Sequence, residues 1–222
     1  MIVNLNLQGK IVIIVGGGKE AQKRINSLLK QDCRIIVISD SINAQISRLS
    51  KTKKITLIKQ KIQDTEFLSE FKPNIVITTT NDNKINQKII NKAKRKNILV
   101  YSSDNPEDSD FSNPAIIDFE KMIQIAIFTG GKSPAMSKEI KTKLEILLKK
   151  IITKEDIARI KIQKTSRKLA KEIISTQFER KECLRSIRTD SRIDQLIKDG
   201  QIKKAEKRAI EILKKWKQIK IS

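Results

Sequence analysis

Three glycines and one aspartate have the types and spacing that bind a dinucleotide. Gly16–Gly18 follow the apolar run Ile11–Val15, and Ala21 completes the pattern G-x-G-x-x-A. The first glycine of this pattern permits a tight turn, the second lets the backbone approach a pyrophosphate, and a small third residue lets a helix pack closely on a strand. Asp40 lies about twenty residues further on, where a carboxylate can accept hydrogen bonds from the ribose hydroxyls.

The surrounding segments predict the elements that such a site requires. The β-branched run Ile11–Val15 predicts a strand buried on both faces, and Ile35–Ile38 predicts a second one that ends just before Asp40. Between them, apolar residues recur at helical spacing up to Lys30, so a helix begins where the glycines end. An acid at the end of the second strand also repels a 2′-phosphate, which favours NAD over NADP. The alternative is a turn of the same geometry that binds no cofactor.

The rest of the first 113 residues continues to alternate strands and helices. Strands are expected at 55–58, 74–79 and 98–101, and helices at 41–49, 65–71 and 82–96. Polar residues follow two of these strands, at Thr78–Asn81 and Ser102–Asp104. Because open parallel sheets bind ligands at the carboxyl ends of their strands, these residues should converge with the glycines and Asp40. Ordinary strand-end and helix-capping chemistry explains the threonines equally well.

Beyond Asp104 the alternation stops. Two strand-like runs are expected near residues 116–117 and 123–128, followed by a Gly-Gly turn and a long helix over 135–152. The remaining residues carry no strand signal and predict helices at 154–178, 180–187, 192–198 and 202–217. We therefore expect an α/β protein with three parts: a Rossmann-type domain (1–113), a central α+β segment that forms a dimer and contacts substrate (114–152), and a C-terminal helical domain (153–222).

The composition excludes several kinds of site. The chain has no histidine, and its two cysteines, Cys33 and Cys183, stand far apart, so neither a disulfide framework nor a transition-metal site is indicated. No apolar stretch is long enough to cross a membrane, and the first residues lack the features of a signal peptide. We therefore expect a cytoplasmic protein without a resident metal.

The net charge of +22 leaves three interpretations open. The charge is +11 in residues 1–150 and +11 in residues 151–222, so the C-terminal part is the more densely basic. This excess could serve a nucleic-acid surface, attract a polyanionic small molecule, or reflect only a Lys- and Asn-rich codon usage. Aromatic residues are only 4% of the chain, which argues against stacking platforms for single-stranded nucleic acid.

A set of motifs in residues 1–150 resembles the siroheme synthase family, in its form as a free-standing precorrin-2 dehydrogenase. The motifs occur in the order and spacing of that family, whereas the C-terminal region matches only as a small helical domain. The matching pieces are Val15–Gly18 with Ala21 and Lys23-Arg24, Thr79–Asp82 followed by Asn86, Asp104-Asn105-Pro106, Asp110-Phe111 leading to Pro114-Ala115, Thr129–Ala135, and Glu139 and Glu145.

This resemblance implies an activity. Such enzymes use NAD to oxidise precorrin-2, a polycarboxylate tetrapyrrole, to sirohydrochlorin, and some members also insert Fe²⁺ into the product. They are homodimers joined through the central segment. The methyltransferase domain of fused members has no counterpart in this sequence.

The resemblance also implies roles for particular residues. The functional aspartate of the family falls on Asp104, and Lys132 and Ser133 are suited to bind substrate carboxylates. The chain departs from the family pattern at Glu20, where an aliphatic residue is usual, so a second negative charge lies near the phosphates. The residues expected to contact the cofactor are Gly16, Gly17, Gly18, Lys19, Glu20, Asp40, Ser41, Thr79, Thr80 and Asn81.

The residues are chemically consistent with dehydrogenation, and other readings stay open. Oxidising a macrocycle needs a hydride acceptor and a group that takes a proton, and Asp104 at an expected strand end is the best candidate base. Its ordinary alternative is a turn aspartate before Asn-Pro. Competing classes are an NAD-sensing regulator that binds nucleic acid through its basic C-terminal helices, and an NAD-binding domain that gates a channel or transporter.

Overall fold

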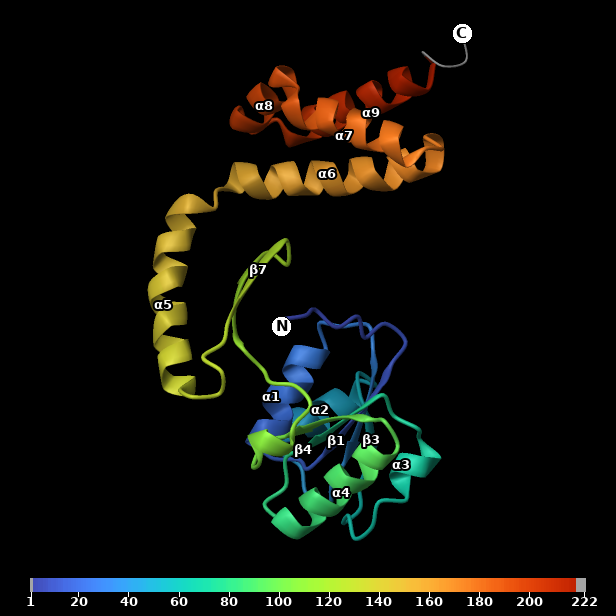
Figure 1. Cartoon of the computed structure of the whole chain (residues 1–222), viewed down its shortest axis with the longest axis vertical. Coiled ribbons are helices and arrows are strands. Elements are labelled where there is room, and N and C mark those ends of the chain that lie inside the picture. The colour runs from blue at the N-terminus through green and yellow to red at the C-terminus, as the bar shows by residue number, and fades with distance from the viewer. Residues whose placement is uncertain (1, 219–222) are drawn as a thin grey trace. The chain divides into compact units, whose positions relative to one another are not determined.

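The computed structural model describes residues 2–218, and they form two compact units, Met1–Asn113 and Pro114–Ser222. Figure 1 shows the order of the elements along the chain. The expected division into three functional domains stays a prediction.

A five-stranded parallel sheet forms the centre of the first unit, in the order β3-β2-β1-β4-β5. The order reverses between β1 and β4, and in such sheets ligands bind at the carboxyl ends of the strands beside this point. The strands are β1 (Ile11–Val15), β2 (Arg34–Ile38), β3 (Thr56–Ile58), β4 (Ile75–Thr78) and β5 (Leu99–Ser102).

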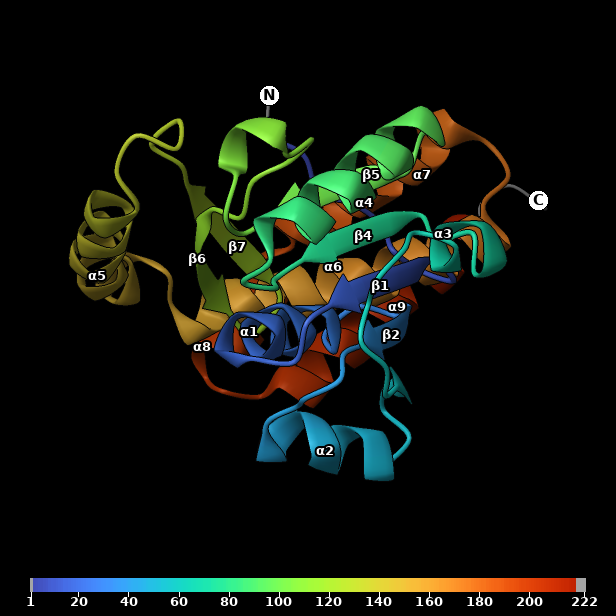
Figure 2. The same cartoon turned by 90° about the horizontal axis from the view of Figure 1, so that it is seen from below.

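Helices cover both faces of this sheet (Figure 2). Alternate residues of each strand point to opposite faces, so Ile13 and Val76 pack with α3 and α4, whereas Ile14 and Ile77 pack with α1 and α2. Burial on both faces explains why these strands are continuous apolar runs. The helices are α1 (Lys19–Leu28), α2 (Ala44–Lys51), α3 (Phe67–Glu70) and α4 (Asn83–Arg95), and a short 3₁₀ helix, η1 (Pro106–Asp108), follows β5.

Side-chain caps fix where two of these helices begin. The Asp82 carboxylate accepts from the backbone N–H groups of Lys84 and Ile85, at 3.0 and 3.1 Å, and starts α4. The Asn43 side chain accepts from Ile46 N at 3.0 Å and starts α2. The prediction that α2 begins at residue 41 was therefore wrong, because Asn43 supplies the cap that Ser41 does not.

The second unit contains an antiparallel hairpin and five helices. Strands β6 (Ala115–Phe119) and β7 (Ile123–Ile127) pair with each other, and the turn after β7 leads into α5 (Pro134–Ile151). Ser133 caps α5 by accepting from Met136 N at 3.2 Å. The C-terminal helices are α6 (Lys154–Ile173), α7 (Gln177–Thr189), α8 (Ser191–Lys198) and α9 (Ile202–Gln218).

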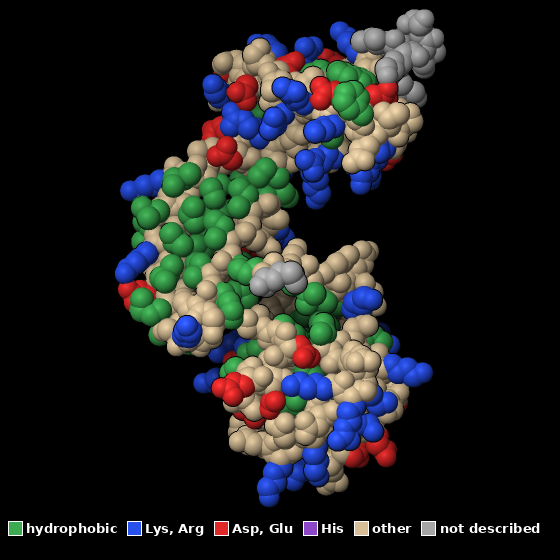
Figure 3. All heavy atoms as spheres, viewed as in Figure 1, with side chains coloured by type: hydrophobic (Ala, Val, Ile, Leu, Met, Phe, Trp, Pro, Cys, Tyr) green, Lys and Arg blue, Asp and Glu red, His purple; other side chains and the backbone are tan. Residues whose placement is uncertain are grey.

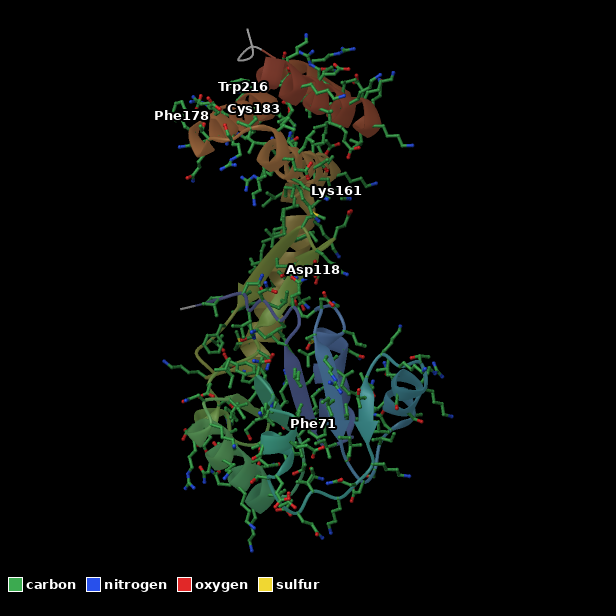
Figure 4. The ribbon with its side chains drawn as sticks, turned by 90° about the vertical axis from the view of Figure 1, so that its right-hand side faces the viewer. Phe71, Asp118, Lys161, Phe178, Cys183 and Trp216 are labelled. Atoms are coloured by element: carbon green, nitrogen blue, oxygen red, sulfur yellow. The ribbon has the colours of Figure 1, made fainter. Side chains whose placement is uncertain are left out.

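The C-terminal helices share one apolar core, to which Cys183 of α7 and Trp216 of α9 contribute (Figure 4). The prediction that α6 extends to residue 178 was wrong. Ile174 is extended at the end of α6, and the Thr176 hydroxyl accepts from Glu179 N at 3.3 Å, which begins a new helix, α7. The α/β fold class, with a parallel sheet followed by C-terminal helices, is confirmed.

Large apolar side chains remain exposed on α5. Figure 3 shows hydrophobic side chains gathered over this helix. Leu147 and Ile151 are 55% and 68% exposed, and Ile146 is 59% exposed. Within the described part of the chain, no helix has the length and apolar character needed to cross a membrane.

Candidate dinucleotide site and the Asp104 network

The glycine turn after β1 is packed against the ends of β2 and β4. Gly16 has φ +115°, and a Cβ placed there would lie 2.5 Å from Thr79 Oγ1 and 3.0 Å from the Thr79 carbonyl oxygen. A Cβ at Gly17 would overlap the Ser41 carbonyl oxygen. The first two glycines are therefore required by the approach of two other strand ends, at the point where the strand order reverses.

Gly18 differs from the other two glycines because it faces open space. It is exposed, has φ −84°, and a Cβ placed on it would meet nothing within 4 Å. Gly18 is the N-cap of α1, and no side chain caps the N–H groups of the first turn. Unpaired N–H groups and the positive end of a helix dipole form an anion site, so this end of α1 suits a pyrophosphate.

Asp40 and Ser41 follow β2 beside this turn, and both are exposed. Ser39 is buried, and its hydroxyl donates to the Ser41 carbonyl oxygen at 2.6 Å, which fixes the bend after the strand. Asn43 N donates to the Gly17 carbonyl oxygen at 3.1 Å and ties the same segment to the turn. The Asp40 carboxylate is thus held on the side of the sheet where a ribose would follow the pyrophosphate.

The threonine segment after β4 has three separate roles. Thr79 borders the glycine turn, and its hydroxyl donates to the Val15 carbonyl oxygen at 2.9 Å. Thr80 turns toward α4, where its hydroxyl donates to Asn86 Oδ1 at 2.6 Å. Asn81 is exposed at the same strand end.

A network of hydrogen bonds fixes the Asp104 carboxylate next to these residues. Asn86 Nδ2 donates to Asp104 Oδ2 at 3.0 Å, and the Ser102 hydroxyl donates to Asp104 Oδ1. Behind them, the Thr78 hydroxyl donates to Ser102 Oγ at 3.0 Å, and Asn86 Nδ2 also donates to the Thr80 carbonyl oxygen at 2.9 Å. Asp104 is exposed, whereas Thr78, Asn86 and Ser102 are buried. A solvent-facing carboxylate is therefore held in one orientation by buried donors.

These donors keep Asp104 ionised. Partial burial raises its pKa, but the hydrogen bonds from Ser102 and Asn86 and from nearby backbone N–H groups favour the charged form more strongly, so the pKa lies below its ordinary value. At neutral pH the group is a hydrogen-bond acceptor of low basicity.

Comparisons with known proteins identify the family. Residues 3–115 match the family model NAD_binding_7, described as "Putative NAD(P)-binding". The chain belongs to this family. The expectation of a nicotinamide dinucleotide is thereby confirmed, and the glycine turn and the uncapped first turn of α1 fit such a ligand.

Curated relatives of the chain are named siroheme synthase, which confirms the resemblance drawn from the motifs. One from Mannheimia succiniciproducens is 27% identical over 91% of this chain, and one from Vesicomyosocius okutanii is 31% identical over 65%. The chain spans 40% and 30% of their respective lengths. A solved structure titled "SirC, precorrin-2 dehydrogenase" has the same fold, with a TM-score of 0.71, 22% identity and coverage of 97% of this chain and 99% of that one. None of these comparisons supports a nucleic-acid-binding protein.

The charge of Glu20 in this NAD(P)-binding protein is balanced within α1. Lys23 Nζ lies 3.1 Å from its carboxylate, and the Arg24 guanidinium pairs with its other oxygen. Burial raises the pKa of Glu20, but Lys23 and Arg24 together hold it below its ordinary value. The second negative charge expected near the phosphates is thus present as an ion pair.

Lys132 and Ser133 belong to the second unit, in the turn between β7 and α5. Lys132 is exposed, and the Ser133 hydroxyl accepts from the first turn of α5. That bond does not use the hydroxyl proton of Ser133. Their contact with substrate stays a prediction.

The acidic loop after Asp104 holds carboxylates that other groups engage. Asp108 accepts from Asn105 Nδ2 at 2.6 Å and lies 3.6 Å from Lys94 Nζ, and Asp110 accepts from Val100 N at 2.8 Å. Among the described residues, no group of three or more potential metal ligands occurs together.

The sequence analysis omitted two residues from the proposed site, Asn86 and Ser102. Asn86 is 1% exposed, on the apolar face that α4 packs against the sheet. A polar residue between apolar neighbours on that face was the available signal, because a buried amide needs partners. Ser102 carried no comparable signal, since its role depends on the pairing of β5 with β4.

Proposed function

We propose that this chain oxidises precorrin-2 to sirohydrochlorin with NAD⁺ as the hydride acceptor. The carrying observation is the placement of Asp104. It is an exposed, ionised carboxylate, held by buried donors at the carboxyl end of β5, on the same edge of the sheet as the glycine turn after β1. The names of the relatives suggest the substrate, and the NAD(P)-binding family suggests the cofactor.

The oxidation removes two electrons and two hydrogens from the macrocycle. A bound NAD⁺ supplies the acceptor for one hydride, and the second hydrogen leaves as a proton. Asp104 is the group proposed to accept that proton. Its lowered pKa means that it is charged before the reaction, and its exposure lets it pass the proton to water.

We assign cofactor contacts to the glycine turn and its neighbours. The backbone at Gly18 and the first turn of α1 would hold the pyrophosphate, and Asp40 would accept from the ribose hydroxyls and disfavour NADP. Lys19, Ser41, Thr79, Thr80 and Asn81 line the strand and helix ends around them.

Lys132 and Ser133 are proposed donors to the substrate carboxylates. Precorrin-2 carries many carboxylates, and an exposed ammonium with a neighbouring hydroxyl can bind one of them. The net charge of +22 favours such a polyanion over long distances.

The proposed assembly is a homodimer formed through α5 and the hairpin β6–β7. Ile146, Leu147 and Ile151 expose apolar surface on one helix, which a second copy would remove from water. Insertion of Fe²⁺ into the product rests on the family resemblance alone. Iron would then be a substrate, and Asp104 would be the carboxylate nearest to accept pyrrole protons.

Anaerobic incubation with precorrin-2 and NAD⁺, followed by absorption spectroscopy, tests the function. Sirohydrochlorin should form with the unmodified protein, and Asp104→Ala should abolish its formation while NAD⁺ binding persists. Asp104→Asn should fail nearly as badly, because an amide does not accept the proton. Glu107→Gln, in the exposed part of the same loop, is the matched control and should retain turnover.

Two results would contradict the proposal. If the unmodified protein binds NAD⁺ but leaves precorrin-2 unchanged, the assigned reaction is wrong. If Asp104→Asn turns over at a near-normal rate, the proton acceptor is another group.

A further inference from the structure

A carboxylate in the first turn of α1 creates an electrostatic problem for the proposed ligand. Glu20 is the second residue of the helix whose N-terminal N–H groups are exposed at Gly18. A negative charge there stabilises the free helix, but it repels a pyrophosphate that binds to the same end. The protein therefore needs a way to neutralise or redirect this charge.

The structure shows the Glu20 carboxylate turned along the helix, away from its N-terminus. Its two oxygens pair with Lys23 and Arg24, which lie three and four residues further on. The two cations differ in environment, because the Lys23 side chain is 73% exposed and that of Arg24 is 18% exposed. Solvent screens the exposed pair, so Arg24 has the stronger effect on Glu20.

Arg24 is itself held by a strand from the other end of the unit. Its guanidinium carbon lies 4.5 Å from the centre of the Tyr101 ring, and its NH2 donates to the Tyr101 hydroxyl at 2.8 Å. Tyr101 belongs to β5, and its ring packs against Phe111 with centroids 5.6 Å apart. A cation over an aromatic face with a hydrogen bond to the same residue is doubly fixed.

The position of Arg24 is not explained by its own hydrogen bonding. Its Nε atom is buried and has no hydrogen-bond partner. An unpaired buried N–H is unfavourable, so the contacts with Tyr101 and Glu20 must outweigh its loss of hydration.

We propose that Arg24 is a positioning residue for the dinucleotide: fixed on Tyr101, it draws the Glu20 carboxylate away from the N-terminus of α1 and neutralises it, so that this end can bind a pyrophosphate. The inference rests on dinucleotide binding at the glycine turn and is independent of the tetrapyrrole reaction. Glu20 is charged at neutral pH, because Lys23 and Arg24 lower its pKa despite partial burial, so its charge has to be balanced.

Arg24→Gln tests this role, because glutamine keeps a polar side chain beside Tyr101 but removes the charge. We expect the Kd for NAD⁺ to rise about 5–10-fold at low salt and the difference to shrink at high salt, as expected for screened repulsion. Binding of adenosine, which has no phosphate, should not change. Lys23→Gln should have a smaller effect because that side chain is mostly in solvent.

The deciding variant is Glu20→Gln combined with Arg24→Gln. Removing the repelling carboxylate should bring the NAD⁺ affinity of the Arg24 variant back to within about 2-fold of the original at low salt. A purely structural role for Arg24 predicts no such rescue, because the lost contact with Tyr101 is not restored. Tyr101→Phe keeps the ring but loses the hydroxyl, so it should give an intermediate loss.

The inference is overturned by either of two results. The first is unchanged NAD⁺ affinity in Arg24→Gln. The second is a double variant as weak as Arg24→Gln alone. Both measurements use binding only, so failure of precorrin-2 oxidation would not affect their outcome.

Discussion

Replacing Gly16 with alanine should destabilise the fold before any ligand is considered. The backbone at Gly16 has φ +115°, which an alanine adopts at a cost of about 1–3 kcal/mol. Its Cβ would also lie 2.5 Å from Thr79 Oγ1 and 3.0 Å from the Thr79 carbonyl oxygen. Such overpacking typically costs about 1–3 kcal/mol. We therefore expect a loss of about 2–6 kcal/mol, a large part of the roughly 5–15 kcal/mol by which domains are stable.

Gly18→Ala is the matched control, because it makes the same chemical change two residues away. Gly18 has φ −84° and no atom within 4 Å of an added Cβ, so alanine should change the stability by less than about 1 kcal/mol. NAD⁺ binding should nevertheless weaken, because the methyl group enters the space that the pyrophosphate would occupy. One variant should thus lose stability and the other should lose binding.

Urea unfolding without ligand and titration with NAD⁺ measure the two effects separately. Thr79→Ala in the Gly16→Ala background removes the nearest clashing atom and should recover part of the lost stability, although the hydrogen bond to Val15 is lost as well. Equal unfolding free energies for Gly16→Ala and Gly18→Ala would refute the argument from packing. Unchanged NAD⁺ affinity in Gly18→Ala would refute the placement of the pyrophosphate.

Three further predictions concern cofactor choice, pH dependence and assembly. NAD should bind better than NADP, and Asp40→Ala should reduce this preference by about 1–3 kcal/mol through the lost hydrogen bonds to a charged group, as competitive titration would show; equal affinities in the unmodified protein would contradict it. Asn86→Ala removes a donor to the Asp104 carboxylate, which raises its pKa, so the acid limb of the rate profile should move to higher pH; an unmoved limb would remove Asn86 from that role. Leu147→Glu or Ile151→Glu should convert a dimer into monomers in sedimentation, because a charge would be buried at the proposed interface, and a concentration-independent monomer before mutation would contradict the dimer.

Local patterns were sufficient to predict the first strand, the glycine turn and the order of the elements. The run at 11–15 is a strand in the structure with the predicted bounds, because β-branched residues buried on both faces leave little choice of conformation. The first turn of α1 is likewise marked by a loss of glycine and a helical apolar period. Such signals depend on neighbours within a few residues, so they can be read from the chain.

Boundaries set by capping were less accessible. Helix α6 ends at residue 173 because the backbone becomes extended there and Thr176 begins another helix. The apolar period continues through this break, since both helices pack on the same core. Periodicity therefore predicted one helix where the structure has two.

The contacts that define the site come from pairs distant in sequence. Asn86 and Asp104 meet because α4 and β5 pack side by side, and Arg24 reaches Tyr101 across 77 positions because α1 and β5 share one face of the sheet. The sequence specified the residue types and their strand ends, but not which hydroxyl or amide would reach which carboxylate. Hydrogen bonds form only within about 3 Å, a distance that the strand order and the packing of the helices determine.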